Sequence, residues 1–170
     1  IQSVDLRVKN MGESLHFYSD LLGMKTKEIS AGIAELYTDT DKPYIIKLTE
    51  DSSEKYPGGN NTGLFHIAIR FQNRKELARV FMRLFNNKYK FQGFSDHLVS
   101  EAIYLADHDG NGIELYTDKP AAEWTYKNGE VEMDTLPLNL SIITKELDDP
   151  GVWEGIHPST GIGHIHLKVS

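Results

Sequence analysis

The chain has 170 residues, of which 39% are hydrophobic and 25% are charged, so it is long and apolar enough to fold into one or two small domains. Its 18 basic and 25 acidic residues give a formal net charge of −7 and form no dense basic run, which argues against a nucleic-acid surface or an anionic-membrane anchor. The sequence has no cysteine and no apolar run of about 18 residues, so we expect a cytoplasmic protein in which any metal is held by His, Asp or Glu.

The first predicted element is a strand, and its pattern occurs three times without gaps. SVDLRV from Ser3, HIAIRF from His66 and HIHLKV from His164 have apolar residues at their second, fourth and sixth positions. One face of each strand would therefore pack into a core, while the other face is free to present polar side chains. The repeat predicts copies of one structural unit.

A helix is predicted after each of the first two strands. Asn10 and Asn73 are each followed three residues later by Glu, which is the spacing of a capping box. Gly23 and Asn87 suit the left-handed residues that end helices. The apolar positions expected to face the core are Leu15/Tyr18/Leu22 in the first helix and Leu77/Phe81/Leu84 in the second.

Strand-like runs follow each helix, so the repeating unit is a βαβββ module. Two such modules are predicted, at residues 1–56 and 62–118, and they indicate an α+β fold. The strand-like runs lie at residues 33–37 and 44–49 in the first module and at residues 102–105 and 112–117 in the second.

The rest of the chain shows a single further copy of the repeat. Residues 119–162 have no repeat and are predicted to be a linker with one helical element in the apolar run 136–147. Residues 163–170 match the first strand of a third module. Because a lone strand cannot bury its face, it either completes the sheet of the second module or is followed by further modules.

Two His and one Glu recur at corresponding strand positions. His66 begins the first strand of the second module, Glu114 lies in its last strand, and His164 occupies the position of His66 in the third copy. A lone strand His is usually a surface residue, but this recurrence favours a metal site with two His and one carboxylate, the set used by non-haem Fe(II) oxygenases. The equivalent residues in the first module, Ser3 and Lys47, predict no metal ligands there.

His166 is an alternative third ligand. It lies two residues beyond His164, so both side chains point from the same face of the strand. We assign His164 to the metal because it shares the position of His66, and we expect His166 to face the substrate or to support a ligand. The sequence by itself leaves both assignments open.

Three motifs resemble the glyoxalase/vicinal oxygen chelate (bleomycin-resistance/dioxygenase) superfamily, and the resemblance covers essentially the whole chain. Within that superfamily the sequence looks most like the bacterial catechol 2,3-dioxygenase-like proteins of about four modules. The resemblance implies tandem βαβββ modules that form a curved mixed sheet around a cavity, with a divalent metal bound by His66, Glu114 and His164. Fe(II) is expected, with Mn, Ni and Zn as alternatives. The motifs are NMGESLHFYSDLLGM at 10–24, GNGIELY at 110–116 and GHIHLKV at 163–169.

The ring-cleaving dioxygenases of this superfamily share a signature that runs from a His through a Tyr to the metal-binding Glu. His97 and Tyr104 have the matching spacing before Glu114. The resemblance implies that His97 is the acid/base group and that Tyr104 donates a hydrogen bond to the substrate oxygens. Two positions depart from the signature: His108 stands in place of Pro, and Ser95 replaces a Gly, Asn, Thr, Ile or Val.

The function favoured by the resemblance is a metal-dependent extradiol dioxygenase that acts on catechol-type vicinal diols with O2. Its partners would be a small aromatic substrate and O2, with no nucleic acid or membrane. A glyoxalase-type lyase or isomerase, with Ni, Zn or Mn as a Lewis acid, is the first alternative. A non-enzymatic small-molecule-binding protein of the same fold is the second. Such modules pair within a chain or between chains, so a homo-oligomer is compatible with the sequence.

Overall fold

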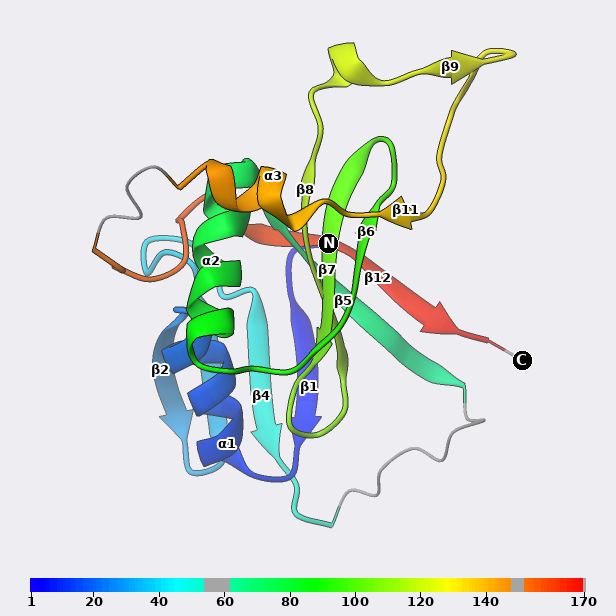
Figure 1. Cartoon of the computed structure of the whole chain (residues 1–170). Coiled ribbons are helices and arrows are strands. Elements are labelled where there is room, and N and C mark those ends of the chain that lie inside the picture. The colour runs from blue at the N-terminus through cyan, green and yellow to red at the C-terminus, as the bar shows by residue number, and fades with distance from the viewer. Residues whose placement is uncertain (54–61, 148–151, 170) are drawn as a thin grey trace.

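The computed structural model describes residues 1–53, 62–147 and 152–169, and these contain a four-stranded sheet, a six-stranded sheet, a small two-stranded sheet and their helices (Figure 1). The first sheet has the strand order β1-β4-β3-β2, with β1 and β4 parallel and the other pairs antiparallel. A short α-helix, α1 (Met11–Leu15), and a π-helical turn, η1 (His16–Leu21), connect β1 to β2. The strands are β1 (Val4–Val8), β2 (Lys25–Ser30), β3 (Ile33–Tyr37) and β4 (Ile46–Glu50).

The second sheet has the order β11-β6-β7-β8-β5-β12, with β5 and β8 parallel. Helix α2 (Arg74–Asn86) follows β5. Strand β12 pairs antiparallel with β5, so the third copy of the repeat completes the sheet of the second unit. The prediction of an α+β fold with mixed sheets is confirmed. The strands are β5 (Gly63–Phe71), β6 (Phe91–Asp96), β7 (Ser100–Ala106), β8 (Gly112–Asp118), β11 (Leu136–Pro137) and β12 (Gly161–Lys168).

Both helices begin where the sequence predicts. The side chains of Asn10 and Asn73 accept hydrogen bonds from the main-chain N–H groups three residues later, at 3.1 and 3.0 Å. The first helix then widens, because the N–H of Leu22 bonds to the carbonyl of Phe17, five residues back. Of the positions expected to face the core, Tyr18 and Leu22 are buried and Leu15 is half-buried against it, and Phe17 joins them as a further buried residue.

The ends of the two helices differ from each other. Gly23 has a φ of +82°, as predicted for a left-handed helix end. The corresponding prediction for Asn87 is wrong, since its φ is −86° and Lys88 is the left-handed residue, with a φ of +57°. Asn87 stays near the helical conformation because both its N–H and its side-chain amide donate to the carbonyl of Arg83.

One hydrophobic core extends through both units. In the second sheet, Ile67, Ile103 and Leu115 point to the face covered by α2, where Leu77 and Phe81 pack against them. The opposite face is lined by small and polar groups, among them Ala68 and Ala102. The alternation of the strands thus separates a packed face from an open face on which a site can form.

Residues 119–139 leave the second sheet and return to it, and we call this segment the arm (Figure 1). After the arm comes α3 (Leu140–Lys145), which buries Ile143 in the common core and lies in the apolar run where a helix was predicted. The structure adds elements that the sequence did not suggest, and they shape the arm. These are a 3₁₀ turn η2 (Ala121–Glu123), the hairpin β9 (Tyr126–Lys127) and β10 (Glu130–Val131), and β11.

Within the described ranges, no helix is long and apolar enough to cross a membrane.

Candidate metal centre

His66, Glu114 and His164 meet on the open face of the second sheet. The Nε2 atoms of His66 and His164 lie 2.9 and 3.1 Å from Oε2 of Glu114. The two Nε2 atoms are 3.3 Å apart. The three side chains come from the adjacent strands β5, β8 and β12. Ala68 of β5 pairs with both Glu114 and His164, and its small side chain leaves the space above the sheet open to them.

These separations fit one divalent ion. Two donor atoms on adjacent corners of an octahedron lie about 3.0 Å apart when each metal–ligand bond is about 2.1 Å long. The three measured separations, 2.9, 3.1 and 3.3 Å, are close to that value. In the part of the chain that the structure describes, no other group of three His, Asp or Glu side chains is assembled in this way. The residues present therefore fit a metal on three neighbouring coordination positions.

The electrostatics of the cluster also favour a cation. His66 and Glu114 are 7% and 4% exposed, whereas the side chain of His164 is 50% exposed and opens the cluster to solvent. Burial would raise the pKa of Glu114, but the hydrogen bond and charge of His66, with His164 and Tyr104, lower the pKa overall. Glu114 is thus kept as a carboxylate, the form that binds metals.

His166 lies on the same face but outside the ligand cluster. It pairs with His66 across β5 and β12, and the planes of the two rings meet at 90° with centroids 4.9 Å apart. Its ring also lies 4.8 Å from that of Phe65. The structure therefore brings His164, and not His166, to Glu114, and it leaves His166 at the side of the site.

A cavity of about 740 Å³ adjoins the cluster, within the range of small-molecule sites. His66, Tyr104 and His166 contribute polar groups to its lining, while Leu64 and Phe65 contribute apolar surface. The lining also includes Gln92, Asp109, Asn111 and Lys168, so the cavity offers a small molecule both polar and apolar surface.

His97 and Tyr104 form a hydrogen-bonded chain that ends at Glu114. The Tyr104 hydroxyl lies 2.8 Å from Nε2 of His97 and 3.1 Å from Oε1 of Glu114. Burial, then the charge and hydrogen bond of Glu114, raise the pKa of Tyr104 well above 10, so the phenol keeps its proton. The other ring nitrogen of His97 lies 3.0 Å from the main-chain carbonyl of Asp134. Sequence reasoning missed this contact because every residue has a main-chain carbonyl, so the sequence does not mark the one that is used.

The first sheet has a different chemistry at the equivalent positions. Lys47 pairs with Asp5 and Glu35, as Glu114 pairs with Ala68 and Tyr104, so Lys47 stands where the second unit has its carboxylate. The Lys47 ammonium lies 2.6 Å from the carboxylate of Asp5. In the first sheet this ion pair stands at the position that the ligand cluster has in the second.

Two glycines of the sequence motifs allow the strands of the site to approach closely. A Cβ atom on Gly112 would overlap the carbonyl oxygen of Phe65, next to His66. A Cβ atom on Gly163 would overlap the hydroxyl of Tyr116. A larger side chain at Gly112 would push β8 away from β5, whereas one at Gly163 would displace the Tyr116 ring.

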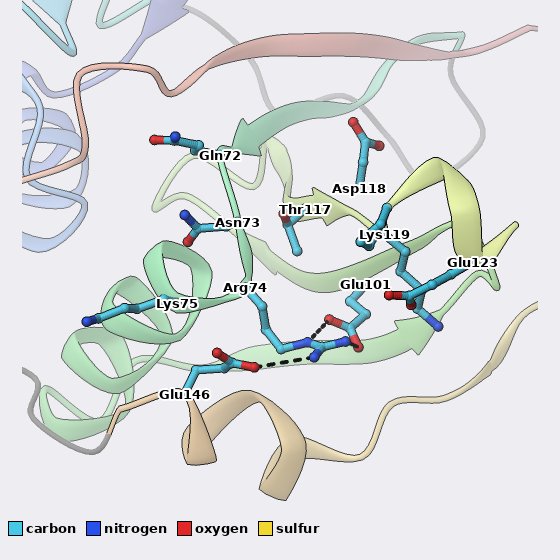
Figure 2. A pocket seen from close by; sticks show the side chains of 11 residues that line it. Gln72, Asn73, Arg74, Lys75, Glu101, Thr117, Asp118, Lys119, Glu123 and Glu146 are labelled. Carbon is cyan, nitrogen blue, oxygen red and sulfur yellow. Dashed lines mark hydrogen bonds and ion pairs between the residues drawn. The ribbon is translucent and has the colours of Figure 1, made fainter.

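A second cavity, of about 520 Å³, lies at the start of α2 and is lined by charged side chains (Figure 2). Arg74 reaches the buried carboxylate of Glu101 at 2.6 and 2.9 Å and Glu146 at 3.4 Å. These contacts link α2 to β7 and to the end of α3. We interpret this cavity as a structural junction.

Comparison with known proteins agrees with the fold. Residues 1–115 match the family model of the Glyoxalase/Bleomycin resistance protein/Dioxygenase superfamily. A solved structure of a glyoxalase/dioxygenase from Nostoc punctiforme superimposes with a TM-score of 0.60 at 20% identity, covering 71% of this chain and 91% of that one. At that identity the likeness concerns the fold.

Two curated relatives are more similar in sequence. A catechol-2,3-dioxygenase of Bacillus subtilis (strain 168) is 36% identical over 166 residues, which cover 97% of this chain and 58% of the relative. A lactoylglutathione lyase of Neisseria meningitidis is 31% identical over 122 residues, which cover 67% of this chain and 87% of the relative. The chain therefore spans little more than half the length of the dioxygenase that it matches.

Proposed function

The chain belongs to the glyoxalase/bleomycin resistance/dioxygenase superfamily, and from this premise we propose that it is a metal-dependent, ring-cleaving dioxygenase acting on catechol-type vicinal diols. The observation that supports this most is the His66–Glu114–His164 cluster, whose donor atoms lie within 3.3 Å of their neighbours beside a partly apolar cavity. Two imidazoles and one carboxylate leave about three positions open on an octahedral ion.

Fe(II) is the metal that this donor set suits best, with Mn, Ni and Zn as alternatives. When bound, such an ion would hold the vicinal oxygens of a diol together with O2 and would lower the pKa of a bound phenol. His66, Glu114 and His164 are the proposed ligands.

The remaining roles fall to His97, Tyr104 and the cavity wall. His97 would accept the proton of a substrate hydroxyl, and Tyr104, which keeps its proton, would donate a hydrogen bond to a substrate oxygen. Leu64 and Phe65 would contact the aromatic ring, with His166 facing it from β12.

A glyoxalase-type lyase or isomerase is the second candidate, supported by the similarity to lactoylglutathione lyase. In such a reaction the metal would act as a Lewis acid without O2. Those sites commonly offer four protein ligands, whereas the cluster found among the described residues has three. The vacant positions therefore favour the oxygen-using reaction.

The domain organisation is part of the proposal. Residues 1–56 and 62–118 would be two modules, residues 119–162 the linker and residues 163–170 the first strand of a third module. The pairing of β12 with β5 supports this reading, because it gives the second module its third ligand.

The decisive experiment loads the full chain with Fe(II) without air and then adds catechol and O2. We expect a yellow ring-opened product and uptake of one O2 per catechol, while the zinc-loaded protein stays silent. If iron-loaded protein leaves catechol intact but forms lactoylglutathione with either metal, the lyase assignment replaces this one.

A further inference from the structure

The arm surrounds the turn that presents His97. This turn joins β6 to β7, and Leu98 within it has a left-handed φ of +69°, a conformation that is unfavourable for a leucine. The arm reaches the turn from two sides: the Lys119 ammonium lies 2.7 Å from both carboxylate oxygens of Asp96, and the Lys119 N–H donates to the carbonyl of Val99 at 2.8 Å. Asp96 in turn accepts from the N–H of Leu98 at 2.8 Å.

The far end of the arm reaches the His97 ring itself. Strand β11 pairs with β6, with Leu136 opposite Asp96, and this pairing carries the preceding residues past the imidazole. The main-chain carbonyl of Asp134 then lies 3.0 Å from Nδ1 of His97. The arm thus contacts both the backbone of the turn and the side chain that the turn presents.

A main-chain carbonyl can only accept a hydrogen bond, so this contact determines where a proton of His97 lies. Nδ1 must carry a hydrogen to donate to Asp134. A neutral imidazole has a single N–H, and Nε2 is therefore left as an acceptor, directed at the Tyr104 hydroxyl 2.8 Å away.

Tyr104 has one hydroxyl hydrogen and two neighbouring acceptors. With neutral His97, the hydrogen points to Nε2 of His97; once Nε2 gains a proton, it becomes a donor to the phenol oxygen, and the hydroxyl hydrogen turns to Oε1 of Glu114, 3.1 Å away. The arrangement with protonated His97 satisfies all three contacts, whereas with neutral His97 the phenol oxygen faces Oε1 of Glu114 without a hydrogen between them. In both arrangements the hydrogen on Nδ1 stays with Asp134.

We propose that the arm is the positioning element of the acid/base group: the Asp134 carbonyl fixes His97 in the Nδ1-protonated tautomer, so that Nε2 is free to accept a proton on the side of the metal centre. The inference rests on the proposed function for the use made of that proton. The tautomer itself is a property of the metal-free protein and can be tested without turnover.

The first test is ¹⁵N NMR of the histidine side chains in the whole, metal-free chain at a pH where His97 is neutral. The His97 signals are identified by their loss in His97→Gln. We expect the nitrogen shifts of an Nδ1-protonated ring, the less common tautomer of free histidine. An Nε2-protonated ring in the wild-type protein would overturn the proposal, whatever the outcome of the ring-cleavage assay.

The second test changes the arm. One variant replaces residues 126–135 with five Gly/Ser residues and so removes the Asp134 carbonyl; a control variant replaces only residues 127–130 with Asn-Gly and keeps it. We expect the first variant to lose the fixed tautomer and, when iron-loaded, to lose kcat about tenfold or more with unchanged iron content. The control variant should retain both the fixed tautomer and the kcat of the wild-type protein. A tautomer that survives loss of the Asp134 carbonyl would show that the arm does not set it.

Discussion

At the scale of single residues, His164 and His166 show how the same strand gives two histidines different positions. Both point from the open face of β12, but His164 pairs with Ala68, beside Glu114, whereas His166 pairs with His66. The carboxylate of Glu114 is therefore 3.1 Å from His164, while His166 is left to pack against rings. Sequence spacing predicts the shared face but not which histidine has a small residue opposite it.

This difference predicts that His164→Ala and His166→Ala have clearly different effects on metal affinity. Removing His164 takes away one of three donor atoms, so affinity for Fe(II) or Zn²⁺ should fall by more than about 100-fold. His166→Ala, the matched control, should keep metal affinity within about tenfold. Titration of the two variants with zinc against a competing chelator measures this, and equal losses would refute the assignment.

Asp96 gives a pH-dependent prediction. Burial would raise its pKa, but the Lys119 ammonium and the Leu98 N–H outweigh burial and lower the pKa below the ordinary 3.8. A carboxylate with a lowered folded pKa stabilises the fold above the unfolded pKa and loses that contribution as the pH falls through the folded value. Asp96→Asn should therefore cost about 1 kcal/mol in free energy of unfolding at pH 7. Urea titrations should show this cost shrinking as the pH falls below the ordinary pKa of a carboxyl group.

At the scale of elements, the junction at the start of α2 ties that helix to the second sheet through a charged contact. Glu101 is 3% exposed and is held by the two nitrogens of Arg74 (Figure 2). Because a buried carboxylate without a partner is costly, this pair fixes where α2 begins above β7.

We accordingly expect Arg74→Ala to lower the free energy of unfolding by about 3 kcal/mol, since it leaves Glu101 buried and unpaired. Lys75→Ala, at the exposed neighbouring position, should change it by less than about 0.5 kcal/mol. Chemical denaturation at pH 7 compares the two. A loss below 1 kcal/mol for Arg74→Ala would mean that water reaches Glu101.

The elements that sequence reasoning found are those with a buried face. Alternation revealed β1, β5 and β12, and the capping residues placed the starts of α1 and α2. Strand β2 was not located because all six of its residues are exposed and give no apolar alternation. The π-helical turn was also missed, since the hydrogen bond from the Leu22 N–H to the Phe17 carbonyl has no signature in the spacing of the apolar residues.

At the scale of the whole molecule, the metal cluster joins parts of the chain that are far apart. His66 and His164 are separated by 98 positions, and β12 is held at the edge of its sheet by pairing with β5 alone. The repeat predicted this convergence because it gave both histidines the same position in their units. It could not predict the arm's contact with His97, which depends on a main-chain group of Asp134.

A bound ion should therefore stabilise the folded chain as a long-range crosslink. With free metal at about 100 times its Kd, the free energy of unfolding should rise by about 2.7 kcal/mol. That increase corresponds to a Tm higher by about 5–10 °C for a chain of this size. Adding a chelator should reverse the gain, and His164→Ala should show almost none of it. A wild-type Tm that is indifferent to metal, measured by differential scanning calorimetry, would speak against the cluster as a metal site.

The Lys47–Asp5 pair shows that the two sheets would obtain a positive charge on their open faces from different sources. In the amino-terminal half, the positive charge is part of the polypeptide and is present as soon as the chain is synthesised. In the second sheet, a cation held by His66, Glu114 and His164 would supply the charge from outside. Because one hydrophobic core joins the two sheets, metal starvation would then change the open face of one sheet and leave the shared packing in place.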